Sequence, residues 1–162
     1  MPLLKHAEVV IDPFVHVSDD EPLPASGSII VSLDRWQNER EALLARGDAF
    51  GVRFASDQSP ARVADDLQHF AVCALDFPKF TDGRAYSYAR LLRDRFGYAG
   101  EVRAVGNVLL EQLQFMARSG FDAFEIDSED PVREWKIAQA DMDVFYQPTG
   151  DGRVTAMQRR RG

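Results

Sequence analysis

The stretch from Phe70 to Asp127 constrains the fold of this chain more than any other part of it. Its segments read FAVCALDF, PKFTDGRAYSYARLLRDRFG, YAGEVRAVG, NVLLEQLQFMARSG and FDAFEID, and their patterns predict strand, helix, strand, helix and strand in turn. Strands that alternate with helices of this length pair in parallel through right-handed crossovers. The stretch therefore predicts a βαβαβ unit at the centre of an α/β protein.

The flanking sequence continues the same rhythm. Residues 29–31 and 49–55 read as further strands, Asp130-Pro131 starts a last helix over residues 135–140, and residues 144–147 read as a final edge strand. We expect a mostly parallel sheet of five or six strands with helices on both faces. A half-barrel is the alternative, because short βα units also build (β/α)₈ barrels. In either arrangement, ligands bind beyond the carboxyl ends of the strands.

The pattern divides the chain into three parts. Residues 1–28 carry two β-branched clusters and then a loop rich in turn formers, which predicts a hairpin or edge strands followed by a loop. Residues 29–147 form the α/β domain. Residues 148–162, with their glycines and terminal arginines, are expected to be a flexible tail.

Charge and composition exclude several classes of protein. The net charge of −7 over 162 residues argues against nucleic acid as a partner, because phosphate binding needs a basic surface. The single cysteine, Cys73, lies in an apolar run and is expected in the core, so one chain can build no disulfide or thiol pair. No segment reaches the roughly 18 apolar residues of a membrane span. We expect a cytoplasmic protein.

Polar residues gather after two neighbouring strands, where we predict an anion site. Asp82 and Asn107 can each cap a helix, and free N–H groups there, with Arg84 and Arg103 nearby, suit a sulfate, phosphate or carboxylate. The alternative is that the arginines only pair with Asp76, Asp94 or Glu101 on the surface. The predicted ligand-binding residues are Lys79, Asp82, Gly83, Arg84, Tyr86, Ser87, Arg103, Gly106 and Asn107.

Motifs for other chemistry do not occur in the sequence. Neither GxGxxG nor GxxxxGK[ST] follows a strand, so no nucleotide cofactor is indicated. His6, His16 and His69 show no metal-binding spacing, and we expect neither a metal nor a cofactor. Ser87 lacks the GxSxG elbow of a hydrolase nucleophile.

The segment FPKFTDGRAYSYARLLRDRFGYAGEVRAVGNVLLEQLQFMARSGFDAFE resembles a family of small bacterial proteins classed as a domain of unknown function. The resemblance extends from LLKHAEVVIDPFVHVSDDEPLP through IIVSLDRW to FYQP. It implies a gene beside an assimilatory sulfite reductase and the label of an oxidoreductase of sulfite reduction. This sequence has Asn107 where the family tends to have aspartate after RAVG, which weakens any acid–base role there.

Three functions stay open at this point. The resemblance implies a role in sulfur assimilation. The residues favour a non-catalytic accessory role there, binding a small oxyanion or docking on the sulfite reductase, over an oxidoreductase, which would need a cofactor or thiol pair. The alternative is a small enzyme for a carboxylate or phosphorylated metabolite, with Asp76 or Asp82 as the base. The third is a homodimeric scaffold that uses a helix face with Gln112 and Phe115.

Overall fold

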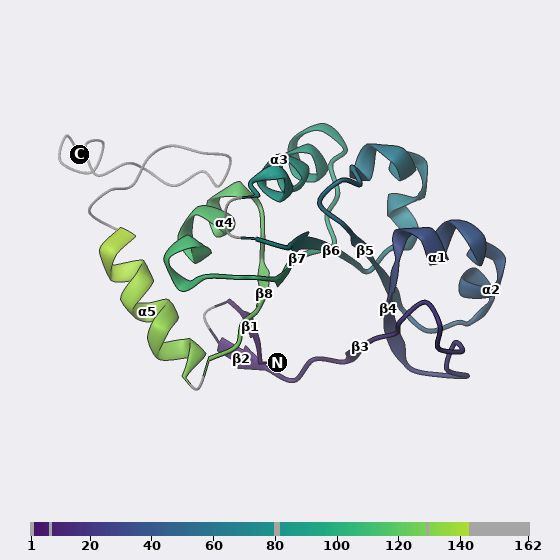
Figure 1. Ribbon diagram of the computed structural model, residues 1–162, viewed down its shortest axis with the longest axis horizontal. Coiled ribbons are helices and arrows are strands. Elements are labelled where there is room, and N and C mark those ends of the chain that lie inside the picture. The colour runs from purple at the N-terminus through teal and green to yellow at the C-terminus, as the bar shows by residue number, and fades with distance from the viewer. Residues whose placement is uncertain (1, 7, 80–81, 129, 143–162) are drawn as a thin grey trace.

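The computed structural model describes residues 2–6, 8–79, 82–128 and 130–142. They form one eight-stranded sheet in the order β2-β1-β8-β7-β6-β5-β4-β3 (Figure 1). The strands are β1 (Leu3–Lys5), β2 (Glu8–Val10), β3 (Phe14–His16), β4 (Ser28–Ser32), β5 (Phe50–Phe54), β6 (Val72–Phe77), β7 (Glu101–Gly106) and β8 (Ala123–Glu125). The helices are α1 (Leu33–Asn38), α2 (Arg40–Ala45), the 3₁₀ segment η1 (Pro60–His69), α3 (Arg84–Arg90), the π-helical turn η2 (Leu91–Arg95), the 3₁₀ turn η3 (Leu110–Gln112), α4 (Leu113–Ser119) and α5 (Pro131–Met142).

The sheet is mixed, and the predicted five- or six-stranded, mostly parallel sheet is wrong in this respect. Strands β3 to β8 are parallel to one another, but β1 runs antiparallel to both β8 and β2. The difference arises because the N-terminal residues supply strands to both edges of the sheet: β1 and β2 extend it beyond β8, and β3 extends it beyond β4.

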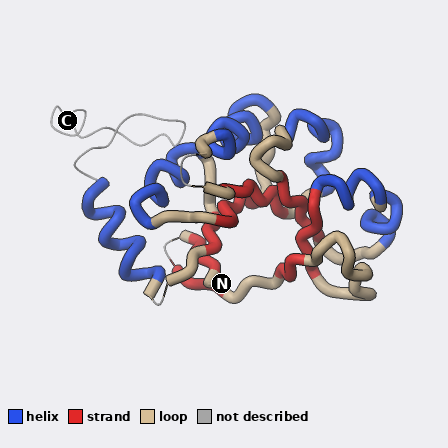
Figure 2. Tube along the Cα trace, in the orientation of Figure 1, coloured by secondary structure: helices blue, strands red, loops and turns tan. Residues whose placement is uncertain are grey.

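The alternative half-barrel is confirmed. The strands curve around a common axis, and the helices lie on the outside of the curve (Figure 2). Helices on both faces of a flat sheet, the first expectation, are therefore not what the chain forms. Because the curved inner face is lined with side chains of opposing strands, it needs no helix to cover it.

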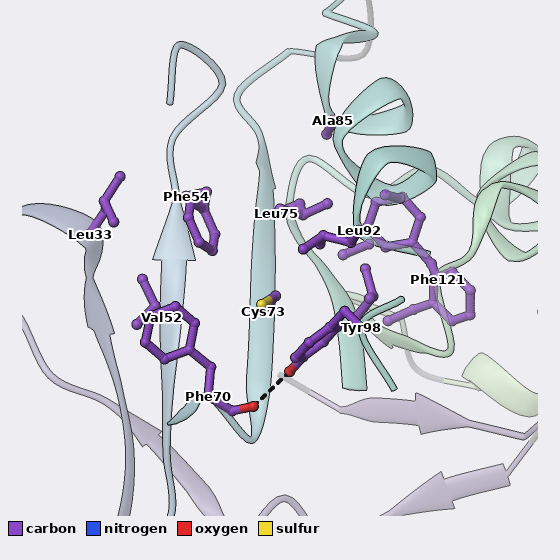
Figure 3. Packing of buried hydrophobic residues seen from close by; sticks show 14 of the residues in the cluster. Leu33, Val52, Phe54, Phe70, Cys73, Leu75, Ala85, Leu92, Tyr98 and Phe121 are labelled. Carbon is purple, nitrogen blue, oxygen red and sulfur yellow. Dashed lines mark hydrogen bonds between the residues drawn. The ribbon is translucent and has the colours of Figure 1, made fainter. Parts of the chain in front are cut away.

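The core has an outer and an inner part. Outward-facing side chains of β5 and β6, such as Phe54 and Cys73, pack under the helices, and the buried hydroxyl of Tyr98 donates to the Phe70 carbonyl at 2.9 Å (Figure 3). Inward-facing Ile30, Val72, Ala74 and Val105 form a second apolar cluster. Burial on both faces explains why the β6 sequence is almost wholly apolar.

Residues 11–13 connect the two edge strands β2 and β3 and so run across the open side of the half-barrel (Figure 1). We call them the closing segment. Its central residue, Asp12, reaches Arg103 on β7, 91 positions later in the chain. The N-terminal strands and this segment therefore complete the ring of backbone around the inner face.

Local sequence signals set several element ends. The Ser32 hydroxyl caps α1 by accepting from the Arg35 N–H at 3.1 Å, and Ser59 caps η1, whose first residue is Pro60. Gly120 ends α4 in the left-handed region with φ of 119°. The predicted strand at 144–147 and the tail at 148–162 lie outside the described residues. No helix in the described ranges is long and apolar enough to cross a membrane.

Candidate functional site

Arg103 lies inside the half-barrel and not at a strand end. Its side chain is 0% exposed, and it donates to Asp12 at 2.7 and 3.1 Å, to Glu101 at 2.8 Å and to Glu125 at 3.2 Å. Burial opposes its charge, but the carboxylates of Asp12 and Glu101 outweigh that effect and raise the pKa of Arg103 above its ordinary value. The guanidinium is charged and already occupied by carboxylates of the protein.

Two further pairs surround Arg103 and complete what we call the inner ion cluster. Lys5 donates to Glu101 at 2.9 Å, and His16 Nε2 lies 2.8 Å from Glu125. Burial raises the pKa of Glu125, but His16 and Arg103 more than offset it, so that the pKa is lowered. The cluster joins β1, the closing segment, β3, β7 and β8, which gives it a structural role.

Arg84 lies at the carboxyl end of the strands, as predicted, but it has partners. It donates to both carboxylate oxygens of Asp82, at 3.1 and 2.8 Å, and to the Ser56 hydroxyl at 3.0 Å. These bonds from Arg84 lower the pKa of Asp82 well below its ordinary value. Such a carboxylate is a weak base at neutral pH, which counts against Asp82 as a catalytic base.

Asp76 and Gly106, two further candidate site residues, lie next to each other. Arg53 Nη2 donates to Asp76 Oδ1 at 3.0 Å. Gly106 has φ of 88°, and a Cβ on it would lie 2.5 Å from the same Asp76 oxygen. Only glycine allows β7 to pass so close to the end of β6.

Asn107 does not cap a helix, and that prediction is wrong. Its backbone N–H donates to the Phe77 carbonyl at 2.7 Å, and α4 begins only at Leu113, after the 3₁₀ turn η3. The tight crossing at Gly106 directs the chain into this turn instead of into a helix.

The other predicted residues lie just after β6 and in the first turns of α3. Lys79 and Ser87 are exposed, and Gly83 is the N-cap of α3 without a side-chain bond. Tyr86 is half-buried, with ring centroids 5.2 Å from Phe77 and 5.0 Å from Phe115. The predicted residues thus form three separate groups, around Arg84, Asp76 and Arg103.

The alternative prediction, that the arginines pair with Asp76, Asp94 or Glu101 on the surface, is correct only in part. Arg103 does pair with Glu101, but inside the half-barrel, whereas Arg84 pairs with Asp82 and Asp76 with Arg53. None of these pairs could be assigned from sequence spacing alone.

A hollow of about 340 Å³ lies at the carboxyl ends of β3, β4 and β5. One side is Arg53, whose side chain is 42% exposed. The other side is the turn after β3, which Arg35 holds by donating to the Ser18 carbonyl at 2.7 Å. The hollow is lined by His16, Val17, Ser18, Asp19, Glu21, Ile30, Val31, Ser32 and Arg53.

Sequence reasoning missed Arg53, His16 and Ser32 as lining residues. One signal was available for Arg53: it is a lone charge in the apolar strand AFGVRFA. In a half-barrel such a position faces inward near the carboxyl end, where ligands bind. The approach of His16 depends on β3 joining the sheet, which no local pattern indicates.

Cys73 is a core residue, and the described carboxylates form no group suited to a metal ion. Cys73 is 0% exposed, and burial raises the pKa of its thiol to about 12, as expected of a core residue. Within the described ranges, no three side chains of His, Cys, Asp or Glu are grouped so that they could hold a metal ion.

Residues 51–157 match the family described as "Bacterial protein of unknown function (DUF934)". The chain belongs to this family. The match confirms the resemblance to a bacterial domain of unknown function. Searches of curated proteins and of solved structures each found no match. In this DUF934 protein the matched range includes Arg53, Asp76, Arg84 and Arg103, whereas His16 and Ser32 precede it.

The loops that follow β3, β5, β6 and β8 in this DUF934 protein are strongly acidic. Their described residues contain Lys79 as the single basic side chain. Hydrogen bonds from Ser18 lower the pKa of both Asp20 and Glu21, so these carboxylates are ionised at neutral pH. We call the seven carboxylates among the described residues of these loops the acidic edge: Asp19, Asp20, Glu21, Asp57, Asp82, Asp127 and Asp130.

Proposed function

We propose that this protein is a non-catalytic accessory component of sulfite reduction, which docks through its acidic edge on a protein partner with a basic surface. The observation that carries the proposal is the seven-to-one excess of carboxylates over basic residues in the described loops at the carboxyl ends of the strands. The link to sulfite reduction comes from the resemblance of the sequence to proteins encoded beside a sulfite reductase. That reductase is therefore the first partner to test.

Part of the acidic edge has an explanation within the fold. Carboxylates are favourable at helix N-termini, where Asp82 and Asp130 lie. Asp20, Asp57 and Asp127, however, are exposed and belong to no helix. A loop surface on which carboxylates outnumber basic side chains in this way speeds the encounter with a basic surface and selects against acidic partners.

The geometry favours docking on a protein partner over two of the functions considered from the sequence, which are oxyanion binding and catalysis with Asp82 as the base. An oxyanion at Arg103 would have to displace a bound carboxylate, and one at Arg84 would lie beside the Asp82 carboxylate on the same guanidinium. An enzyme that uses Asp82 as its base would work against the lowered pKa of that residue. Docking requires neither change.

The test is a binding titration between the full chain and purified sulfite reductase at increasing salt. We expect an interaction that weakens with salt, because exposed charges are screened over about 8–10 Å at physiological ionic strength. The double variant Asp57→Lys/Asp127→Lys is expected to bind at least about tenfold more weakly, since reversing rim charges removes attraction and adds repulsion.

The matched control is Glu41→Lys/Asp65→Lys, which makes the same change in net charge on exposed residues of α2 and η1. It should bind nearly as well as the unmodified chain. Absence of binding at low salt, or an equal loss in both double variants, contradicts the proposal.

A further inference from the structure

The hollow beside Arg53 has the position and size of a ligand site. It opens at the carboxyl ends of parallel strands, where half-barrels and barrels bind their ligands. Its volume of about 340 Å³ falls at the lower end of the range for small-molecule pockets. A ligand of few atoms fits such a space.

Arg53 forms a positive pole on one side of the hollow. Its one hydrogen bond to the described residues uses Nη2, which donates to Asp76. A guanidinium has five N–H donors, so most of them stay available to a ligand. Asp76 itself lies against the backbone at Gly106, where β6 and β7 pass closely. The fork geometry suits a carboxylate.

Asp19 and Glu21 form a negative pole on the opposite side. Asp19 Oδ1 accepts from the Ser32 hydroxyl at 2.6 Å, and Glu21 Oε1 accepts from the Ser18 hydroxyl at 2.6 Å. The second carboxylate oxygen of each has no hydrogen-bond donor among the described residues. These two oxygens can accept from an ammonium group.

The sum of charges around the hollow selects among ligands. Among the lining residues, Arg53 contributes one positive charge, which Asp76 already pairs through one hydrogen bond, and Asp19 and Glu21 contribute two negative ones, while His16 is engaged with Glu125. A dianion such as sulfate meets a net repulsive field, and a simple carboxylate leaves the negative pole unpaired. A molecule with both charges, a short distance apart, satisfies both poles.

We propose that this hollow binds a small zwitterion of the α-amino acid class, with its carboxylate on Arg53 and its ammonium group between Asp19 and Glu21. The small volume of the hollow favours a small side chain on the ligand. This inference is independent of the docking proposal, because it requires no protein partner.

The test is thermal melting of the full chain with L-alanine, L-serine or L-cysteine, beside acetate, methylamine and sulfate at equal ionic strength. A ligand that binds only the folded state raises the melting temperature. At about ten times its dissociation constant, we expect an amino acid to raise it by about 3–5 °C. Acetate, methylamine and sulfate should each give a much smaller shift.

Two variants test the two poles separately. The Arg53→Met and Asp19→Asn variants should each lose the rise in melting temperature that the amino acid causes. If one variant fails to fold, the other still tests the inference. Arg84→Met is the matched control, because Arg84 is an exposed, Asp-paired arginine at the same edge but does not line the hollow. It should keep the full shift, as should Asp57→Lys/Asp127→Lys.

Three results would overturn the inference. The first is no shift with any amino acid, and the second is an equal or larger shift with sulfate or acetate, which would indicate a simple anion site. The third is an amino-acid shift that survives in the folded pole variants. Because the docking variants retain the hollow, failure here and failure of the docking proposal are separate outcomes.

Discussion

Asp12 holds Arg103 from the opposite side of the half-barrel through two hydrogen bonds, Nη1 to Oδ2 at 2.7 Å and Nη2 to Oδ1 at 3.1 Å. Asp12 belongs to the closing segment, and Arg103 to the middle of β7. The pair therefore ties the segment that crosses the open side to the centre of the sheet. A parallel fork of this kind is among the stronger ionic contacts in proteins.

Replacing Asp12 by alanine should destabilise the protein. Arg103 keeps Glu101 and Glu125 as partners but loses its bidentate one, and a buried charge that loses a partner is costly. We expect a loss of about 1–3 kcal/mol in the free energy of unfolding, less than for a fully isolated pair. Urea denaturation measures it. Asp65→Ala, at an exposed site, is the control and should change stability by less than about 0.5 kcal/mol. Equal stability of both variants would show that the fork does not hold the segment.

Gly106→Ala should also destabilise the protein, through backbone strain and through a steric clash, and a control variant can separate these two causes. Gly106 has φ of 88°, and a Cβ there would lie 2.5 Å from Asp76 Oδ1 and 2.7 Å from the Phe77 carbonyl oxygen. Gly47 has φ of 75° but nothing within 4 Å of a Cβ. Gly47→Ala therefore reports the backbone strain alone, about 1 kcal/mol. In urea denaturation, we expect Gly106→Ala to lower the free energy of unfolding clearly more than Gly47→Ala does. Equal losses in the two variants would contradict the close contact at Gly106.

The parallel part of the fold could be predicted because its signals are local. Each strand from β4 to β8 is marked by its own apolar run, and the caps at Ser32 and Ser59 and the stop at Gly120 lie beside the elements they limit. The half-barrel was only an alternative, because the same βα units build flat and curved sheets. The pairing of β1 with β8 joins residues about 120 positions apart, which no local pattern reveals.

The inner ion cluster shows why the candidate site was harder to predict. In EVRAVG, Arg103 is a charge within an apolar strand, and sequence reasoning placed it at the strand end beside Arg84. Its register opposite Ala74 instead turns it inward. Its main partner, Asp12, comes from the closing segment, and the spacing of the two residues carries no information about their contact. Only the tertiary fold decides whether such an arginine is free for a ligand.

Protonation of Glu125 should account for part of the fall in the free energy of unfolding at acidic pH. Its pKa in the folded protein is lowered from the ordinary value of 4.5, because His16 and Arg103 outweigh the effect of burial. A lowered folded pKa stabilises the protein above the unfolded pKa, and this contribution is lost as the pH falls through the folded value. Urea denaturation between about pH 7 and pH 3 should therefore show a steeper loss for the unmodified chain than for Glu125→Gln. Parallel curves would mean that Glu125 titrates alike in both states.

The thiol of Cys73 should be unreactive in the folded protein. It is 0% exposed on β6, and burial raises its pKa to about 12, so at pH 8 almost none of it is the reactive thiolate. Iodoacetamide should label the chain fully in urea but only slowly without it, at a rate set by opening of the core. The Asp12→Ala variant should label faster without urea. If the core opens as one unit, the increase in labelling rate should match its loss in the free energy of unfolding. Fast labelling of the unmodified chain would show that β6 opens locally and that the inner and outer core do not unfold together.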